Sequence, residues 1–276
     1  MSGPSNERQD SPSTGGESYS LGYGSASSAM AGRSAARQAA FFLPHLKPGM
    51  TLLDCGCGPG TISMGLAELD QTIKVTGIDL SEDQVKRATA SAAQRGISNV
   101  RFEVGSVYEL PFPDDSFDGV FNNALFEHLA DPADALRDIR RVLKIGGVLG
   151  IRAAAHNLDL VHPPDPKLTK LFDVYTKVLA KNGGHPGVGA RLGAMMRKAR
   201  FSEVSMTASH DHYSAGSAAQ VFGEQLANIP ILGQAVGLGI ITEDESQSIS
   251  VAWRAWGAHR DAFLARTYGE AVGWKT

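Results

Sequence analysis

The segment LLDCGCGPGTIS, residues 52–63, decides the fold prediction. An apolar run ends in Asp54, and three glycines then follow at intervals of two, Gly56, Gly58 and Gly60. With the turn residues KPG just upstream, the pattern predicts a buried strand over 50–55 that turns directly into a helix over 60–70. The glycines leave bare backbone where any Cβ would obstruct a ligand. We therefore expect a ligand to lie against this loop.

Strand and helix patterns alternate on both sides of this segment. Ser81 is a typical N-cap and Gly96 a typical C-terminal stop, and Asp131 followed by Pro132 starts another helix that ends at Gly146. The helices expected here are 25–46, stopped by Pro44, then 60–70, 81–96 and 132–145, and the strands are 50–55, 74–80, 100–106, 117–123 and 148–154. Strands that alternate with helices indicate an α/β fold, with a parallel sheet covered by helices on both faces.

After His156 the pattern is less regular. We expect helices at 167–184, 189–201, 217–226 and 242–259, a strand at 203–214, and a helix or strand at 261–274.

Composition narrows the class of protein. The 276 residues are 42% hydrophobic, which suits one domain with a substantial core and an added lid. A net charge of −3 gives no global basic field for nucleic acid, and no apolar run is long enough to span a membrane. Residues 1–18 are polar and lack a hydrophobic core region, so we expect a disordered leader and not a secretory signal. These features favour a cytoplasmic protein.

The cysteines support the same location. Cys55 and Cys57 are the only two in the chain, too few to staple a domain of this size. We expect both to be reduced thiols that point into the core around the glycine loop.

Two acids show which ligand the loop suits. A carboxylate at Asp54 would repel a pyrophosphate but attract an ammonium or another cation. Asp79 ends the second strand about twenty residues after the loop, the usual position for an acid that binds ribose hydroxyls. A nucleoside with a positively charged appendage fits both, and S-adenosylmethionine is such a molecule.

Four ordered motifs extend this interpretation to a family. LLDCGCGPGTIS, GIDLS, VGSVYELPFPDDSFDGVFNNALFEHLADP and LRDIRRVLKIGGVL resemble the class I S-adenosylmethionine-dependent methyltransferases, in particular the UbiE-like small-molecule subgroup, over about residues 45–155. The resemblance implies a Rossmann-like, doubly wound sheet of seven strands whose last strand is antiparallel. Strands six and seven would then lie near 203–214 and 261–272.

The resemblance also implies a domain organisation. The disordered leader over 1–18 precedes an N-terminal helical lid over 19–46. The methyltransferase domain covers 47–276, with an acceptor-binding insertion around 157–200 and a helical segment around 215–259.

The resemblance assigns cofactor contacts position by position. Asp54, Gly56 and Gly58 would contact the methionine end, and Gly60 completes the turn. Asp79 would hold the ribose. Leu80, Gln84, Ser106 and Val107 would lie near the adenine, and Asn122 and Ala124 near the sulfonium. Many members have aspartate at the position of Ser106, so a weaker contact is expected there.

The catalytic group is less certain, because a general base is needed only for an acceptor that must lose a proton. His156, at the end of the fifth strand, is the leading candidate, since ligands bind at that edge of open sheets. His128 is a second candidate, or else it holds Glu127 or Asp131 across its loop. Tyr23 lies in the segment that closes over the site in related enzymes.

No metal site is predicted. His210 and His212 alternate along the expected strand at 203–214 and are interpreted as exposed strand residues.

These observations predict transfer of a methyl group from S-adenosylmethionine to carbon or oxygen of a small, partly apolar molecule, leaving S-adenosylhomocysteine. A quinone-like, aromatic or terpenoid natural-product acceptor is favoured. The alternatives are a tRNA or rRNA methyltransferase, which should carry a basic patch, and a non-catalytic S-adenosylmethionine-binding subunit. The N-terminal helix could also be exchanged between subunits of a homo-oligomer.

Overall fold

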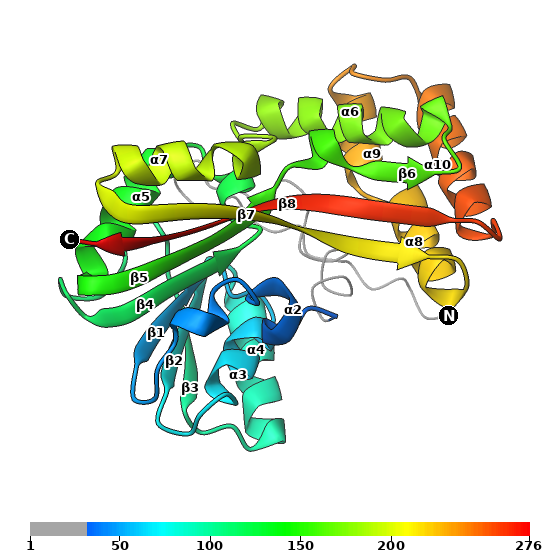
Figure 1. Ribbon diagram of the computed structural model, residues 1–276. Coiled ribbons are helices and arrows are strands. Elements are labelled where there is room, and N and C mark those ends of the chain that lie inside the picture. The colour runs from blue at the N-terminus through cyan, green and yellow to red at the C-terminus, as the bar shows by residue number, and fades with distance from the viewer. Residues whose placement is uncertain (1–31) are drawn as a thin grey trace, which may run out of the picture.

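The computed structural model describes residues 32–276, which form one α/β unit built on an eight-stranded sheet (Figure 1). The strands are β1 Thr51–Cys55, β2 Lys74–Asp79, β3 Val100–Val104, β4 Phe117–Asn123, β5 Leu143–Ala154, β6 Leu160–His162, β7 Phe201–Ser214 and β8 Phe263–Lys275. The α-helices are α2 Ala35–Gln38, α3 Thr61–Ala67, α4 Glu82–Arg95, α5 Pro132–Val142, α6 Pro166–Lys181, α7 Leu192–Lys198, α8 Ser217–Ala227, α9 Ile231–Gly237 and α10 Glu243–Gly257. The short 3-10 helices are η1 Leu43–His45, η2 Phe126–His128, η3 His156–Leu158 and η4 Val188–Arg191.

The strand order confirms the predicted doubly wound sheet with an antiparallel last strand. The order is β3-β2-β1-β4-β5-β8-β6, and β7 also pairs with β8. Strands β1 to β5 run parallel, whereas β8 is antiparallel to β5, β6 and β7. The sheet has eight strands and not the expected seven, because Leu160–His162 pairs with β8 beyond the end of β5. Three residues are too few for a periodicity signal.

In the central strands, the side chains of neighbouring residues point to opposite faces of the sheet. Leu53 and Val120 pack in one core with α5, while Leu52 and Phe121 pack in another with α2 and α3. This is the alternation of a strand buried on both sides. The helices therefore cover both faces, as the sequence predicts.

The predicted helix caps are present. The Ser81 hydroxyl accepts a hydrogen bond from the Gln84 N–H, and the Asp131 carboxylate accepts from the first turn of α5. However, α5 ends at Val142, before the expected Gly146. Leu143 pairs with Phe117 in the sheet, so the segment after Val142 is strand.

The N-terminal helix differs from the prediction. Of the expected helix over 25–46, the described part contains only the four residues of α2 and the turn η1, which includes Pro44. Phe42 lies fully buried against the sheet, where a Cβ at Gly150 would come within 2.4 Å of its ring. Burial of this ring, together with the missing N–H of Pro44, explains why the helix does not continue.

Four helices, α6, α8, α9 and α10, form a cap with a core of its own around one end of β8 (Figure 1). Trp253 and Leu264 are fully buried in that core. The cap is thus assembled from two separate segments of sequence. By contrast, Leu192 and Met196 of α7 pack in the sheet core with α5, so the expected insertion over 157–200 is divided between the cap and the sheet. The short helix α9 lies within the helical segment predicted around 215–259, although no separate helix was predicted at its position.

Candidate active site

The glycine loop turns sharply at the end of β1. The N–H groups of Gly56 and Cys57 both donate to the Ile78 carbonyl of β2, at 2.8 and 2.9 Å. Gly56, Gly58 and Gly60 all have positive φ, which other residues adopt only with strain. A Cβ at Gly60 would also come within 2.5 Å of the Phe102 ring. The sequence is therefore glycine-rich here because the backbone conformation and the packing both require it.

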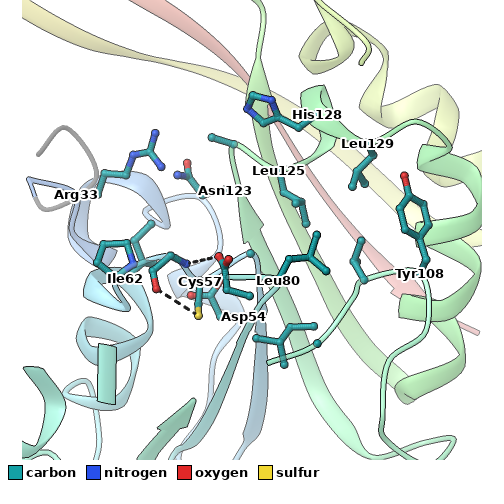
Figure 2. Close-up of a pocket in the computed structure, with 18 of the residues that line it drawn as sticks. Arg33, Asp54, Cys57, Ile62, Leu80, Tyr108, Asn123, Leu125, His128 and Leu129 are labelled. Atoms are coloured by element: carbon teal, nitrogen blue, oxygen red, sulfur yellow. Dashed lines mark hydrogen bonds between the residues drawn. The ribbon is translucent and has the colours of Figure 1, made fainter. Parts of the chain in front are cut away.

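This loop forms one wall of a large pocket at the carboxyl ends of the parallel strands (Figure 2). The pocket has about 1170 Å³ of empty space, counting the part that opens to solvent. Among the predicted residues, its walls include Asp54, Gly56, Gly58, Asp79, Leu80, Val107, Ala124 and His128.

Asp54 is a buried acid that faces this pocket. Its Oδ2 accepts a hydrogen bond of 2.6 Å from the Ser63 hydroxyl. The pKa of Asp54 is raised to about 7, mainly by burial; the Ser63 hydrogen bond lowers it in part, and nearby Asp79 adds a smaller upward contribution. The carboxylate thus lacks a cation among the described residues. A bound ammonium group would supply the missing charge.

Asp79 is held rigidly by the backbone. Its Oδ2 accepts from the Gly58 N–H and its Oδ1 from the Ser81 N–H, both at 2.9 Å. A carboxylate is an acceptor with two oxygens, so Asp79 suits the two hydroxyls of a ribose. Asp54 and Asp79 therefore line one pocket, and their separate roles in cofactor binding stay predictions.

Side chains from several elements form the remaining walls. Leu80 is about half exposed and lies beside the opening, and Val107 is buried in the wall. The predicted residues Gln84, Ser106, Asn122 and Gly60 lie outside the walls. Their assigned contacts stay predictions.

The contacts of Ser106 and the strand position of Asn122 explain why neither residue is part of the wall. The Ser106 hydroxyl accepts from the Tyr108 N–H at 3.1 Å, so it stabilises the loop. Asn123, the next residue in β4, lines the pocket instead of Asn122 because side chains alternate along a strand. The Asn123 Oδ1 accepts from the Arg152 guanidinium at 3.0 Å.

Several wall residues had no signal in the sequence analysis. Arg33, Cys57, Tyr108, Leu125, Leu129 and Asn182 all line the pocket. Figure 2 shows the Arg33 side chain extending toward Asn123 on one side, with Leu129 and Tyr108 on the other. Both cysteines are free and buried, as expected. The family motif includes Cys57, Tyr108, Leu125 and Leu129, but nothing local marks Arg33 or Asn182 as pocket residues.

The structure places the two candidate histidines, His128 and His156, in different environments. His128 lines the pocket, and its pKa is lowered to about 3 by burial, by Arg33 and by His156. The imidazole is therefore neutral at pH 7, and the low pKa makes it a weak base.

His156 does not line this pocket. Its Nε2 lies 2.5 Å from the Arg266 guanidinium, which donates to it, and its Nδ1 lies 3.2 Å from the Asp159 carboxylate. Burial and Arg266 lower its pKa to about 4. With both ring nitrogens engaged, His156 is placed for a structural role. Its catalytic assignment stays an untested prediction that this geometry does not favour.

Tyr23 and the leader lie outside the described residues, so their predictions are untested. His210 and His212 lie in β7 as expected, and His210 Nδ1 is 3.3 Å from the Thr267 hydroxyl. Among residues 32–276, no cluster of three or more potential metal ligands is present. Within the same range, no helix has the length and apolar character required to cross a membrane.

Comparison with known proteins identifies the family of this chain. Residues 46–199, more than half of the chain, match the family described as a methyltransferase domain. The chain therefore belongs to that family and is a class I S-adenosylmethionine-dependent methyltransferase.

Individual relatives support the assignment. The protein ltbC of Aspergillus luteorubrus, described as a probable methyltransferase, is 29% identical over 264 residues, which are 88% of this chain and 92% of that protein. A demethylmenaquinone methyltransferase of Listeria monocytogenes is 30% identical over 201 residues, covering 66% of this chain and 80% of the relative. The crystal structure of YcgJ from Bacillus subtilis has a similar fold, with a TM-score of 0.59, 18% identity, and coverage of 87% of this chain and 98% of that one.

The residues present fit the cofactor of this family. Asp54 offers a buried acid for an ammonium group, Asp79 offers carboxylate lone pairs for a ribose, and the glycine loop leaves room for close approach. When bound, S-adenosylmethionine supplies a methyl group that its sulfonium activates for transfer.

Proposed function

We propose that this enzyme methylates a small, partly apolar acceptor, such as a quinone-like, aromatic or terpenoid ring compound, on carbon or oxygen. The observation that carries the proposal is the composition of the pocket. An acidic end at Asp54 and Asp79 suits the cofactor, and Leu125 and Leu129 make other parts of the wall apolar. An acceptor with apolar surface would bury it against those walls.

The relatives are consistent with this class of acceptor. The Listeria relative is named for a menaquinone precursor, and a Synechocystis relative, 42% identical over 107 residues, is named for a phytyl hydroquinone. The second match covers 39% of this chain and 33% of that protein, so it supports the chemistry of the shared domain alone.

The chain's own residues would act mainly by positioning. Asp54, held by Ser63, would fix the amino-acid end of the cofactor, and Asp79 would fix the ribose. Because both acids are anchored before the ligand arrives, little reorganisation accompanies binding. Walls of Leu125 and Leu129 would exclude water from the space where the acceptor approaches.

His128 is the described histidine best placed to assist an acceptor that loses a proton. It lines the same pocket as Asn123, the last residue of β4, and Ala124, which follows it. It would accept the proton of a hydroxyl acceptor during transfer, as a weaker base than a solvated histidine because its pKa is lowered to about 3. A carbon acceptor without an acidic proton would use the same pocket with no such step.

Two measurements test this proposal. Titration calorimetry should show binding of S-adenosylhomocysteine, and an assay of its formation should show turnover with hydroquinones, phenols or terpenoid alkenes. Turnover confined to RNA would contradict the proposed acceptor class. Binding without turnover on a broad panel of small molecules and RNA would favour the non-catalytic alternative.

A further inference from the structure

A second cavity lies beside the cofactor pocket, beneath the cap helix α6. Its walls are Glu127, Ala154, His156, Asn157, Tyr175, Thr176, Leu179, Pro186 and Gly187. These residues come from η2, from the end of β5, from η3, from α6 and from the loop after α6. The cavity is therefore built where the cap meets the carboxyl edge of the sheet.

The two cavities share two short segments of chain. In η2, Glu127 faces the second cavity while the adjacent His128 faces the cofactor pocket. In the loop after α6, Asn182 lines the cofactor pocket, and Pro186 and Gly187 line the second cavity. One turn of η2 and one loop thus lie between the two cavities, which are therefore close neighbours.

The shared loop is held against η2. The His185 N–H donates to the Glu127 carbonyl at 2.8 Å, and the His185 Nε2 lies 3.1 Å from the Ala130 carbonyl. Gly184 packs so tightly that an added Cβ would come within 2.6 Å of the same Glu127 carbonyl. The position of Glu127 is therefore well defined.

One oxygen of the Glu127 side chain can accept a further hydrogen bond. It is only 2% exposed, and its Oε2 has no hydrogen-bond partner among the described residues. A buried acceptor atom without a partner is costly, and such atoms often mark places where a ligand binds. The neighbouring His156, in contrast, already has both ring nitrogens engaged.

The charge state of Glu127 indicates what kind of group suits it. Burial raises its pKa, although Arg33 and Arg152 act in the opposite direction. An ammonium partner would need the ionised carboxylate, whereas a hydroxyl forms a hydrogen bond with either state. Apolar Leu179, Ala154 and the ring of Tyr175 make up much of the remaining wall. A hydroxyl on an otherwise apolar ring matches this set of groups.

We propose that the second cavity is an acceptor subsite and that Glu127 determines its specificity by accepting a hydrogen bond from a hydroxyl group of the acceptor. This inference rests on the proposed function, because it names where and how the small-molecule acceptor is held. Glu127 contacts the acceptor but is not given a part in methyl transfer.

The experiment compares thymol with thymol methyl ether, two probes that differ only in a hydroxyl hydrogen replaced by methyl. Their binding to the protein saturated with S-adenosylhomocysteine is measured by titration calorimetry. We expect thymol to bind about tenfold more tightly, as one buried hydrogen bond provides. Glu127→Met keeps the size of the side chain but cannot accept strongly, and it should bring the two affinities to within about twofold.

A second pair of variants tests the cavity itself. Thr176 is half-buried on the cavity side of α6, and Thr176→Trp should fill the space and abolish binding of both probes. Lys177, the next residue, is exposed, and Lys177→Trp serves as the matched control that leaves both affinities unchanged. Thymol binding that survives Thr176→Trp, or a preference for thymol that survives Glu127→Met, would overturn the proposal.

Affinity for S-adenosylhomocysteine is measured on the same samples. If the parent protein does not bind it, the proposed function fails. If all variants bind it normally and only the probe affinities depart from expectation, the acceptor subsite alone fails.

Discussion

At the scale of single residues, the site depends on an acid that is unfavourable in the cofactor-free protein. Asp54 is buried, its pKa is about 7, and its hydrogen bond from Ser63 does not compensate for the lost solvation. Selection for stability alone would favour an uncharged residue here. The acid is explained by the positive charge of the ligand.

Replacement of this acid should weaken cofactor binding. We expect Asp54→Asn to lower the affinity for S-adenosylhomocysteine about 10- to 100-fold, as for loss of a charge-assisted hydrogen bond. Asp83→Asn, on the exposed first turn of α4, is the control and should change nothing. Titration calorimetry on both variants decides the matter, and an unaltered affinity for Asp54→Asn would remove this residue from the site.

The same acid predicts a pH dependence of binding. In the cofactor-free protein Asp54 binds a proton below about pH 7, and a bound ammonium lowers that pKa, so binding releases a proton there. Affinity should therefore be nearly constant just above pH 7 and fall by up to about tenfold per pH unit below it. Calorimetry in buffers of different ionisation enthalpy measures the released proton directly. No proton release near pH 6 would show that Asp54 is already ionised.

The two histidines should respond differently to the same substitution. His128→Gln should lower kcat about a hundredfold for an acceptor that loses a proton, with affinity for S-adenosylhomocysteine retained. His156→Gln should mainly lower the midpoint of thermal unfolding, because it disrupts the contacts with Arg266 and Asp159. If His156→Gln instead abolishes kcat at unchanged stability, the base is His156 and the structural interpretation is wrong.

At the scale of elements, β5, β7 and β8 are joined to the site by a buried arginine. Arg152 of β5 is 1% exposed and lies over the Tyr268 ring of β8, with its guanidinium carbon 3.6 Å from the ring centroid. It donates to Asp211 of β7 at 3.0 Å and to Asn123 in the pocket wall, also at 3.0 Å. One side chain thus links the antiparallel strands to the position of Asn123.

Loss of this arginine should be severe. Arg152→Met leaves Asp211 and Asn123 without their partner, and breaking a buried ion pair in this way costs about 3–5 kcal/mol. The free energy of unfolding, from urea denaturation, should fall by that amount. Arg137→Met breaks an exposed pair with Asp134 on α5 and should cost less than about 0.5 kcal/mol. Equal losses for the two variants would contradict the role given to Arg152.

At the scale of the whole molecule, the cap and the sheet share the long strands β7 and β8. Tyr213 of β7 stacks on Phe222 of the cap helix α8 at 3.6 Å, while Phe201 at the other end of β7 packs in the sheet core. The core of the cap therefore packs on β7 and β8, which are also strands of the sheet. Unfolding of one part should remove support from the other.

We therefore expect one cooperative unfolding transition. Trp253 and Trp256 lie in the cap and Trp274 lies beside the sheet core, so tryptophan variants can report on each part. Fluorescence from Trp253 and Trp256 in a Trp274→Phe variant should give the same urea midpoint as far-UV circular dichroism. A separate, earlier fluorescence transition would show that the cap unfolds independently.

Much of the fold follows from local sequence. The ends of β1, β2 and β4, the caps of α4 and α5, and the glycine turn with its two acids depend on nearest neighbours and were predicted from residues alone. Strands buried on both faces show long apolar runs, so their existence was also clear. The identity of the cofactor follows from the same local features.

Other features depend on which distant segments meet. Arg33 and Asn182 reach the cofactor pocket from segments that lie far apart in the chain, and η2 and α6 contribute to the second cavity together. His156 looked suited to catalysis by its place after β5, but Arg266 and Asp159 occupy its nitrogens. Such contacts carry no periodic signal, because they depend on how the cap docks on the sheet. The sequence by itself determined the glycine turn and its two acids, since these follow from their immediate neighbours; only the tertiary structure decided which other residues complete the cofactor pocket and the proposed acceptor side, since those residues come from segments far apart in the chain.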